Sequence, residues 1–433
     1  MSICMMERRI GKSILIVGSG GREHAIAWKL DQDARKNGTP IHQHFAPGNG
    51  GTADLGRNLD IDIMDIDRQI NYARDNGIEF VIYGPEAPLI AGAVDAMTEA
   101  GIRAFGPSKQ AAMLEGSKIW ATEIMEKYDI PHPESESFAS YDAALDYVSK
   151  YDPTKIVIKA DGQALGKGVV LPRSPEEARE TILDFMVRKS LREAGERVLI
   201  QKRLEGQEVS VIAFMSNQIG LLVPARDYKR AYDGDAGPNT GGMGGYAPNE
   251  NLSRETLYRI HDVILRRTQF AMRSEGIPYR GVLYAGIMLT DEGPKVLEFN
   301  VRMGDPEAQL QLPRLITPLL PAMEATMRET LDPDMVRSDS RASVGVVVAS
   351  NGYPVEYRKG KPIYISEDLP PEVVVLQAGT VIREGKLITN GGRLLTVVAS
   401  GDTVDKAGER VYSVLDYEEV KVEGSFYRRD IAS

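Results

Sequence analysis

The chain of 433 residues has little of several things, and each shortage excludes a class of protein. It has one cysteine, Cys4, so no disulfide can form within the chain, and this favours a reducing compartment, the cytoplasm. The first ten residues lack the apolar core of a signal peptide. No run approaches the roughly 18 apolar residues of a membrane span. We therefore expect neither a secreted nor a membrane protein.

Basic residues are also in short supply. There are 52 Lys and Arg against 62 Asp and Glu, which gives a net charge of −10. An acidic surface argues against broad binding of nucleic acid or anionic membrane, although a local pocket can still be basic and accept a small anion. The composition, 42% hydrophobic and 26% charged, is ordinary for a globular protein. The length predicts two to four domains, because single cores stop growing well before it.

The first part of the chain alternates short apolar runs with segments of helical spacing. Ser13–Gly18 and Glu79–Tyr83 are typical of buried strands, and Arg22–Leu30 and Ile66–Asn76 are typical of helices. Such alternation predicts a parallel, doubly wound sheet. We place this α/β domain at residues 11–110.

Hairpins dominate the part that follows, residues 111–328. Lys155–Ala160 and Val169–Leu171 predict one hairpin, and Gly286–Asn300 predicts another. The remainder, residues 329–433, alternates short strands with glycine turns and predicts a third, smaller α+β domain.

Polar residues end the second hairpin. Glu298 and Asn300 lie two apart on a predicted strand, so both point to one face, and Arg302 continues that face if the strand runs on. Two oxygen ligands beside an arginine suit a divalent metal and the phosphates it bridges. The alternative is a solvated strand face with an incidental ion pair. Further acids in the segment 303–307 favour the metal, because few structural turns need so much charge.

The first hairpin carries a glycine-rich loop, Asp161–Gly168. Gly162, Gly166 and Gly168 allow backbone N–H groups to turn toward phosphate oxygens, and Lys167 adds a positive charge. The spacing does not match the P-loop pattern. The alternative is a mobile hairpin without a ligand.

Lysines near this loop bear on the choice. Lys159 lies inside an apolar strand, where a lysine needs a partner, and a phosphate is a good one. Lys118 is a weaker candidate, with a surface lysine as the equal alternative. Glu208 is placed to accept hydrogen bonds from ribose hydroxyls, and a solvated acid without a ligand is the equal alternative.

A second phosphate site is predicted in the first domain. Gly18 ends a strand, and Gly20 and Gly21 open a helix whose N-terminus can face an anion. Glu23 stands where the dinucleotide pattern needs its third glycine, so a single phosphate fits better than NAD. At the same sheet edge, Glu86 is placed to meet sugar hydroxyls.

Together these motifs resemble the phosphoribosylamine–glycine ligases (glycinamide ribonucleotide synthetases), an ATP-grasp family of purine biosynthesis. The likeness runs from about residue 13 to the end. Its motifs are Gly18–Ala25, Ala46–Asn49, Gly84–Leu89, Leu114–Lys118, Val157–Gly168, Gly237–Gly244, Leu297–Glu307 and Asn390–Arg393. The resemblance implies a pre-ATP-grasp domain, an ATP-grasp unit of two α+β subdomains and a C-terminal α+β domain.

The resemblance also implies roles for particular residues. Glu298 and Asn300 would hold Mg²⁺ or Mn²⁺, and ATP would contact Lys118, Lys159, Glu208 and the loop with Gly162, Gly166, Lys167 and Gly168. Substrate contacts are expected at Gly20, Gly21, Arg22, Glu86, Asn239, Arg302 and Asp305, and catalytic roles at Lys159, Arg302 and Asp305. Charge matching assigns the glycine carboxylate to Arg302 and its ammonium to Asp305. The segment Gln201–Leu204 departs from the acidic and aromatic residues common in the family, which leaves backbone contacts to hold the adenine.

The implied reaction joins glycine to 5-phosphoribosylamine through glycyl phosphate, with ATP giving ADP and phosphate. Phosphoryl transfer needs charge neutralisation and alignment more than a covalent residue, and no nucleophile–histidine arrangement is present. The alternatives are another ATP-grasp ligase, a nucleotide-binding regulatory protein without turnover and, third, a dehydrogenase. We expect small-molecule substrates only, no nucleic-acid or membrane partner, and a monomer or homodimer.

Overall fold

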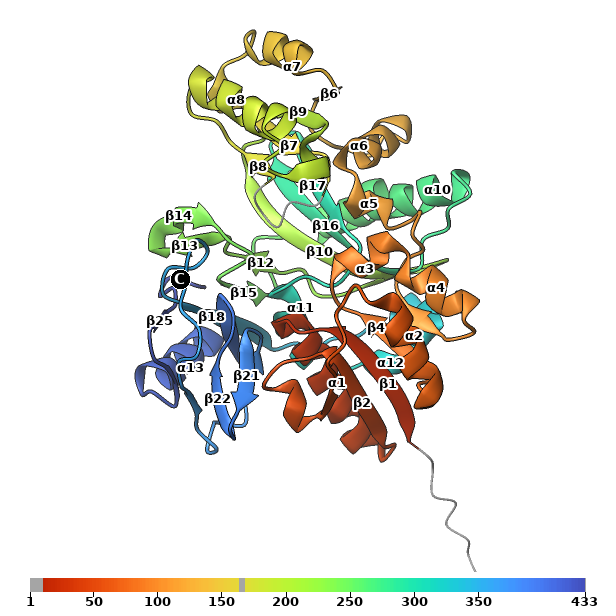
Figure 1. Ribbon diagram of the computed structural model, residues 1–433, viewed down its shortest axis with the longest axis vertical. Coiled ribbons are helices and arrows are strands. Elements are labelled where there is room, and N and C mark those ends of the chain that lie inside the picture. The colour runs from red at the N-terminus through yellow and green to blue at the C-terminus, as the bar shows by residue number, and fades with distance from the viewer. Residues whose placement is uncertain (1–10, 163–167, 433) are drawn as a thin grey trace, which may run out of the picture.

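The computed structural model describes residues 11–162 and 168–432. Figure 1 shows an N-terminal domain in red and orange, a small lobe in yellow at one end of the molecule, a green large lobe and a blue C-terminal domain. The mixed α/β and α+β architecture predicted from the sequence is confirmed. No helix among the described residues is long and apolar enough to cross a membrane.

The N-terminal domain is a doubly wound sheet. Its five strands are all parallel, in the order β3-β2-β1-β4-β5. The strand order reverses between β1 and β4, so their carboxyl ends, at Gly18 and Gly84, meet at the edge where ligands bind in such folds. β2 was not predicted, because its sequence Ile-His-Gln-His lacks an apolar run. The elements are β1 (Lys12–Gly18), α1 (Gly21–Asn37), β2 (Ile41–Pro47), β3 (Gly56–Asn58), α2 (Ile66–Asp75), β4 (Phe80–Tyr83), α3 (Glu86–Ala91), α4 (Ala93–Glu99) and β5 (Ala104–Phe105).

The small lobe is an antiparallel sheet with its own hydrophobic core. Its strand order is β6-β9-β7-β8, and Lys159 pairs with Val169 in the predicted hairpin. Ile158, Ile182 and Val198 belong to the small core beneath helices α7 and α8. The lobe therefore folds around contacts that it does not share with the other domains. Its elements are β6 (Ser135–Phe138), α7 (Tyr141–Val148), β7 (Ile156–Ala160), β8 (Val169–Val170), α8 (Pro175–Ile182) and β9 (Val198–Lys202).

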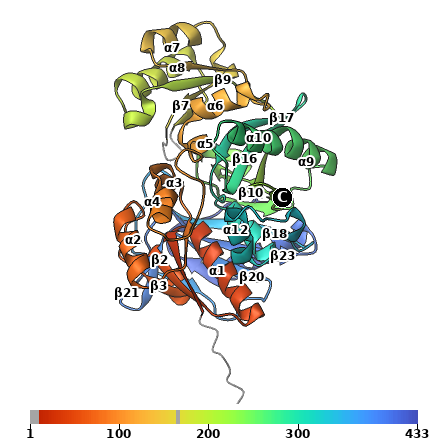
Figure 2. The same cartoon turned by 90° about the vertical axis from the view of Figure 1, so that its right-hand side faces the viewer.

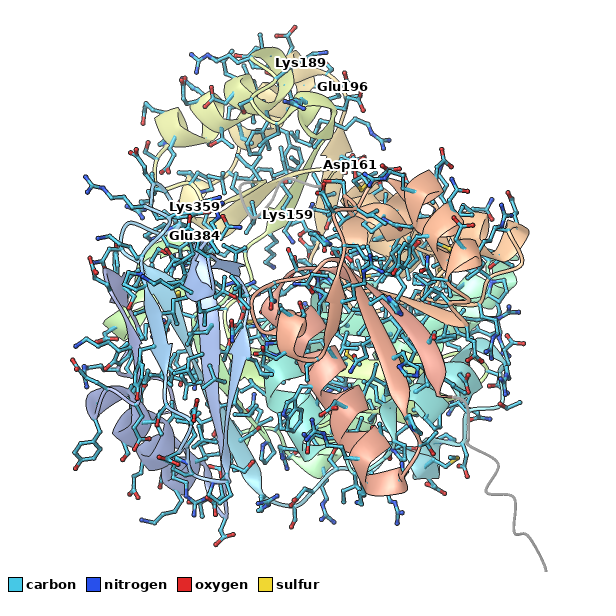
Figure 3. All side chains as sticks on the ribbon, turned by 60° about the horizontal axis from the view of Figure 1, so that its bottom comes forward. Lys159, Asp161, Lys189, Glu196, Lys359 and Glu384 are labelled. Atoms are coloured by element: carbon cyan, nitrogen blue, oxygen red, sulfur yellow. The ribbon has the colours of Figure 1, made fainter. Side chains whose placement is uncertain are left out.

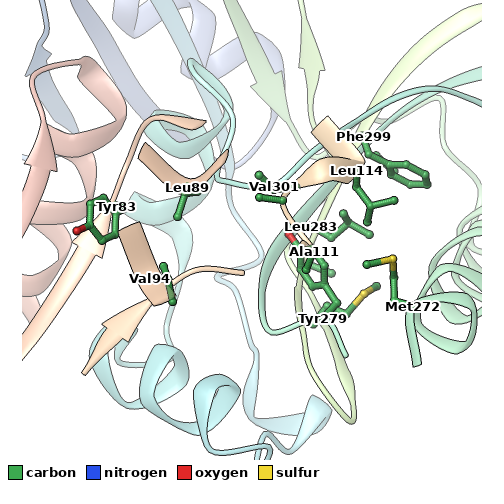
Figure 4. Close-up of a cluster of buried hydrophobic side chains, with 14 of the residues drawn as sticks. Tyr83, Leu89, Val94, Ala111, Leu114, Met272, Tyr279, Leu283, Phe299 and Val301 are labelled. Atoms are coloured by element: carbon green, nitrogen blue, oxygen red, sulfur yellow. The ribbon is translucent and has the colours of Figure 1, made fainter. Parts of the chain in front are cut away.

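The large lobe, in contrast, shares its core with the N-terminal domain. Its sheet has the order β11-β10-β16-β17, all antiparallel. Figure 4 shows Leu89 and Val94 of the N-terminal domain in the cluster that also holds Leu283, Phe299 and Met272. The lobe comprises α5 (Met113–Gly116), α6 (Lys118–Lys127), β10 (Gln207–Met215), β11 (Ile219–Leu221), α9 (Arg254–Ile260), α10 (Arg267–Ser274), β16 (Gly281–Thr290), β17 (Gly293–Asn300), α11 (Glu307–Gln311) and α12 (Leu319–Met327).

The C-terminal domain contains a six-stranded sheet to which an earlier part of the chain contributes. The order is β12-β15-β18-β23-β20, with β25 also paired to β18. β12 and β15 come from residues 226–247, far from the rest of the domain in sequence. The elements of this sheet and around it are β12 (Arg226–Asp227), β13 (Arg230–Tyr232), β14 (Ala236–Asn239), β15 (Gly244–Ala247), β18 (Ala342–Ser350), β19 (Ile363–Ile365), β20 (Val373–Gln377), β21 (Thr380–Arg383), β22 (Lys386–Thr389), β23 (Arg393–Gly401), α13 (Val404–Asp416), β24 (Val420–Val422) and β25 (Ser425–Phe426).

The N-terminal and C-terminal domains are in direct contact through α1 and β20 (Figure 2). The Nδ1 atom of buried His24 accepts a hydrogen bond from the Gln377 N–H at 2.7 Å. Asn49 donates to the Gln377 carbonyl at 2.9 Å. Burial lowers the pKa of His24 to about 4, so the ring is neutral when it accepts this bond. His24 is thus a residue of the domain contact.

Candidate active site

The carboxyl-terminal end of β17 carries Glu298 and Asn300. A register shift in the pairing with β16 makes Leu297 an extra residue of β17. Beyond this bulge Phe299 and Val301 enter the hydrophobic core. Glu298 and Asn300 therefore lie together on the other face of the strand.

Two lysines lie at the base of the small lobe, near this end of β17. The Nζ of Lys159 donates to the Leu297 carbonyl at 2.9 Å, and the Nζ of Lys118 donates to the Gly162 carbonyl at 3.0 Å. Figure 3 shows Lys159 pointing from the lobe toward the other domains. Burial lowers the pKa of Lys159 to about 8, and Glu298 opposes that shift. An ammonium group has three donors, so each lysine keeps hydrogens for a further acceptor.

Glu298 lies among positive charges. Burial raises the pKa of its carboxyl, but four cations hold that pKa below its ordinary value. In order of effect they are Lys229, Lys159, Lys118 and Arg302. Glu298 is therefore ionised at neutral pH.

Glu298 and Asn300 are the oxygen donors that a metal would meet here. Among the residues that the structure describes, no three acidic, histidine or cysteine side chains converge on one point. A carboxylate and an amide oxygen are too few for a closed metal cage, but they suit an ion whose remaining ligands are phosphate oxygens and water. The donor set fits a hard divalent cation that arrives with a nucleotide.

Asp161, the first residue of the glycine-rich loop, binds the start of helix α6. Its carboxylate accepts from Ser117 Oγ at 2.8 Å and from the Ile119 N–H at 2.9 Å, and it contacts Arg197 at 2.5 Å. A Cβ at Gly162 would stand 2.8 Å from that of Ala194, so only glycine fits there. Two loop residues predicted to bind ATP, Gly166 and Lys167, lie outside the described residues. Gly168 is described, and its carbonyl accepts from the Ala160 N–H at 2.8 Å.

A polar pocket lies on the face of β10 and β16 beside Glu298. Glu208, Ser210, Asp227, Lys229 and Tyr284 are among its lining residues. Glu208 is 3.2 Å from Lys229, so the acid predicted to meet ribose is ion-paired here. Of these five, only Glu208 was predicted as a site residue.

Two acids of this region were not predicted. Glu307 accepts from Ser210 Oγ and from Tyr284 OH, both at 2.8 Å. Asp227 is half-buried, and its Oδ1 is shielded from solvent and has no hydrogen-bond partner among the described residues. Burial, reinforced by the charge of Glu307, raises the pKa of Asp227 well above its ordinary value. Glu307 lies inside a motif of the family resemblance, whereas Asp227 lies outside those motifs.

Arg302 joins the N-terminal domain to the large lobe. It contacts Glu86 and Glu115 at 3.2 Å each and Asn300 Oδ1 at 2.8 Å. Glu115 in turn accepts from the Val301 N–H at 2.7 Å. Burial raises the pKa of Glu115 to about 7, although Arg302 opposes the shift. Sequence reasoning placed Glu86 and Arg302 in the site but gave Glu115 no role, despite its place in the motif before Lys118.

The glycine turn after β1 is tightly packed. The Gly20 N–H donates to a Glu23 oxygen at 2.5 Å, and Arg22 contacts the other oxygen of Glu23 at 2.6 Å. A Cβ at Gly21 would stand 2.5 Å from the amide nitrogen of Gln309. Side-chain atoms at either glycine would therefore displace the groups that close the turn.

Asp305 and Arg393 bring the C-terminal domain to this turn. A Cβ at Gly20 would lie 3.4 Å from the Asp305 carboxylate. Asp305 accepts from Gln309 at 2.6 Å and is 3.1 Å from Arg393. Arg393 also donates to the carbonyl of Gly241 at 2.6 Å. It was missed as a site residue because its role depends on a contact across domains.

Asn239 is the predicted substrate residue that the structure leaves apart. It is exposed in the two-stranded sheet of β13 and β14, where it pairs with Arg230. The other predicted residues of the described chain surround the junction of β17, the small lobe and the glycine turn.

Comparison with family models divides the chain into three matches. Residues 12–115 match "Phosphoribosylglycinamide synthetase, N domain", residues 116–308 match "Phosphoribosylglycinamide synthetase, ATP-grasp (A) domain", and residues 343–433 match "Phosphoribosylglycinamide synthetase, C domain". The three matches cover most of the chain in family order.

Individual proteins show the same likeness. The chain is 45% identical over 429 residues to a phosphoribosylamine–glycine ligase of Rhodopirellula baltica, covering 97% of each chain. It is 44% identical to that of Caldanaerobacter subterraneus, covering 97% of this chain and 99% of the relative. The crystal structure of the Thermotoga maritima phosphoribosylamine–glycine ligase superposes with a TM-score of 0.83 at 34% identity, covering 97% of this chain and all of that one.

Proposed function

Because the chain belongs to the phosphoribosylglycinamide synthetase family, we propose that the junction around Glu298 is the active site of an ATP-dependent phosphoribosylamine–glycine ligase. The enzyme joins glycine to 5-phosphoribosylamine in purine biosynthesis. The observation that carries the site assignment is the buried Lys159 and the half-buried Lys118 beside ionised Glu298, since both lysines retain donors for phosphate.

The reaction proceeds in two steps. A carboxylate oxygen of glycine attacks the γ-phosphorus of ATP, the bond to the β-phosphate oxygen breaks, and glycyl phosphate and ADP form. The amine nitrogen of 5-phosphoribosylamine then attacks the acyl carbon, inorganic phosphate leaves with the electron pair of the C–O bond, and the nitrogen loses a proton. Both steps need charge neutralisation and alignment, which fixed cations and a closed site supply.

The small lobe binds ATP in this proposal. Lys159 and Lys118 donate to its phosphates, assisted by the loop residues Gly162, Gly166, Lys167 and Gly168. Glu208 binds the ribose once its contact with Lys229 is exchanged for hydroxyl groups. The adenine is held by backbone groups of β9, because Gln201 is buried against Ser135 and is not free to bind it.

Glu298 and Asn300 hold the divalent metal that ATP-grasp enzymes use with ATP. When bound, the ion neutralises charge on the phosphate oxygens that it contacts. We assign Mg²⁺ or Mn²⁺ to this position, since both are hard cations that take oxygen ligands.

The domain junction binds the other two substrates. The sugar phosphate lies on the turn of Gly20, Gly21 and Arg22, with Glu86 near the sugar hydroxyls. Asn239 lies apart in this structure and would contact the substrate only after a movement of the β13–β14 hairpin. Asp305 holds the glycine ammonium and Arg302 its carboxylate. Arg302 uses four of its five N–H groups within the described chain, and one N–H of Nη1 is left to donate to the glycine carboxylate.

Four further expectations complete the proposal. The enzyme acts in the cytoplasm as a monomer or homodimer on small molecules alone. Its domains are residues 11–110, 111–328 and 329–433, with the strands of residues 226–247 crossing from the second to the sheet of the third. Limited proteolysis and sedimentation would measure these limits and the oligomeric state.

The decisive experiment is an ADP-release assay with ATP, glycine and freshly prepared 5-phosphoribosylamine, each omitted in turn. We expect release that needs all three. Release that is independent of glycine would instead support another ATP-grasp ligase. ATP binding without ADP formation under any combination would support a regulatory nucleotide-binding protein.

A further inference from the structure

The residues from Arg428 to Ala432 at the end of the chain lie against the segment that carries two lining residues of the polar pocket. Arg428 is one of the largest fully buried side chains of the protein, with 1% of its surface exposed. A buried guanidinium is costly unless its donors are all used, so its partners deserve a physical explanation.

The partners of Arg428 lie on both chain segments. Its Nε and Nη2 donate to the two carboxylate oxygens of Asp430 at 2.7 and 2.6 Å. Its Nη1 donates to the Arg230 carbonyl at 3.0 Å and to Asp235 at 2.9 Å. The guanidinium therefore bridges the C-terminal tail and the β13–β14 hairpin.

The same guanidinium lies over the ring of Tyr228. The Cζ of Arg428 lies 4.9 Å from the centre of the Tyr228 ring, and the Cζ of Arg226 lies 4.8 Å from it. Tyr228 is buried in the core of the C-terminal domain, with Tyr246 at a ring-centre distance of 6.4 Å. Cation–π contacts of this kind fix the ring in place.

Tyr228 separates the two pocket residues along the chain. The backbone here is paired on one side, with the Tyr228 N–H donating to Gly244 at 2.9 Å and the Thr240 N–H donating to Lys229 at 2.8 Å. Alternate residues of an extended segment face opposite sides. Tyr228 therefore faces the C-terminal core while Asp227 and Lys229 face the polar pocket beside Glu298.

We propose that Arg428 is a positioning residue for the ligase reaction, which holds Asp227 and Lys229 toward the pocket through the Tyr228 ring and the Arg230 carbonyl. The inference rests on the proposed function of that pocket. Arg428 touches no substrate. It acts from the end of the C-terminal domain on a strand of the active site, so the last residues of the chain set the geometry of the centre.

The test measures turnover, ATP affinity by calorimetry and melting temperature for variants of the full-length enzyme. Arg428→Met removes the positive charge and the hydrogen-bond donors of the guanidinium but keeps a long, unbranched side chain. We expect kcat to fall about 10- to 100-fold, the effect of a small misplacement of active-site groups. ATP affinity should change little, because Lys118 and Lys159 are untouched. Arg428→Lys should restore part of kcat.

Arg429→Met is the matched control. Its neighbouring guanidinium is exposed and contacts Asp416 and the Tyr427 hydroxyl, away from residues 226–235. The backbone N–H of Arg429, which donates to Asp233, is retained in the variant. This control should turn over like the wild type.

Tyr228 provides a second pair of variants if Arg428→Met fails to fold. Tyr228→Phe keeps the ring between the two guanidinium groups, and Tyr228→Leu removes it. We expect only the leucine variant to lose turnover. The double variant Tyr228→Leu with Arg428→Met should be no slower than the slower single variant, because both changes break one linkage.

Several results would overturn the proposal. They are a folded Arg428→Met enzyme with wild-type kcat, equal losses in Tyr228→Phe and Tyr228→Leu, or losses that multiply in the double variant. A uniform fall in ATP affinity and melting temperature together with kcat would show a purely structural role. If the wild type itself does not consume glycine, the proposed function fails, and this outcome is distinct because it precedes any variant.

Discussion

The arginines of the domain junction and the two lysines at the base of the small lobe, Lys118 and Lys159, carry the same charge but are held differently. Arg302 contacts two carboxylates, and Arg393 contacts Asp305. In the described part of the chain, Lys118 and Lys159 donate only to backbone carbonyls. The charges of the junction arginines are thus neutralised by carboxylates of the protein, whereas the lysine charges are left to bind an anionic ligand.

This difference corresponds to the way the two regions are built. The N-terminal domain and large lobe share one core, and the C-terminal domain contacts the N-terminal domain through α1 and β20. The small lobe packs around a core of its own. A lobe with few shared contacts can move as a unit, and lobes that move are suited to closing over a reactive intermediate. The junction supplies the fixed half of the site.

The largest effect is expected at Glu298, where the two regions meet. Glu298→Gln keeps the shape of the side chain but removes the negative charge that faces Lys229, Lys159 and Lys118 and that we propose to hold the metal. We expect kcat to fall at least about 100-fold, as for loss of one preorganised electrostatic contact, with a much smaller change in stability. Steady-state ADP release and thermal unfolding measure the two effects.

Glu292→Gln is the matched control for that variant. Glu292 lies at the turn of the same hairpin, where its side chain is exposed and contacts Lys295. It should turn over and melt like the wild type. Wild-type activity in Glu298→Gln would remove this residue from the mechanism.

The second prediction contrasts the two kinds of cation directly. Arg302→Met leaves Glu86 and Glu115 without their shared partner, so the free energy of unfolding should fall by about 3 kcal/mol, the cost of breaking a buried pair. Lys159→Met removes a buried ammonium that makes no ion pair with a carboxylate within the described chain, so stability should stay level or rise while ATP binding weakens. Urea unfolding and calorimetry test both. Equal stability losses in the two variants would contradict the comparison.

Whether a site residue could be predicted from the sequence depends on how far apart along the chain the residue and its partners lie. Glu298, Lys159 and the glycine loop could be proposed as site residues from the sequence because strand periodicity and a lysine within an apolar strand are local signals. Glu115 and Arg393 were missed because their partners are 187 and 88 residues away along the chain. No local pattern reports such distances.

The fold shows the same limit. The parallel N-terminal sheet and both hairpins were predicted from alternation, but the addition of β12 and β15 to the C-terminal sheet was not. That segment contains six glycines between residues 233 and 245, so its composition indicated a loop. β15 forms because it pairs with the edge of β18, and β12 pairs with β15 in turn. The partner strand β18 lies about 100 residues later in the chain, so the segment alone does not predict this pairing.

The third prediction concerns the junction in acid. The pKa of His24 lies at about 4, below its ordinary 6.5, so the folded state binds fewer protons than the unfolded chain between these values. Its contribution to stability is complete above about pH 6.5 and is lost as pH falls toward 4, by about 3 kcal/mol in total. Unfolding measured from pH 7 to 4 should show a shallower pH slope in His24→Gln, which cannot titrate. Identical slopes would mean that burial does not hold His24 neutral in the folded protein.

The smallest predicted effect concerns Lys159 and is a loss of ATP affinity above about pH 8. Burial lowers the pKa of Lys159 to about 8 from 10.5, so in the free protein this lysine loses its proton just above physiological pH. Phosphate binds the protonated form, so ATP affinity should be constant below about pH 8. Above it, binding must take up a proton, and affinity should fall by up to about tenfold per pH unit. Lys159→Arg stays charged throughout this range and should remove the slope. A wild-type affinity that stays flat from pH 7 to 10 would mean that Lys159 does not meet the phosphates, because a lysine that binds them cannot lose its proton without weakening the complex.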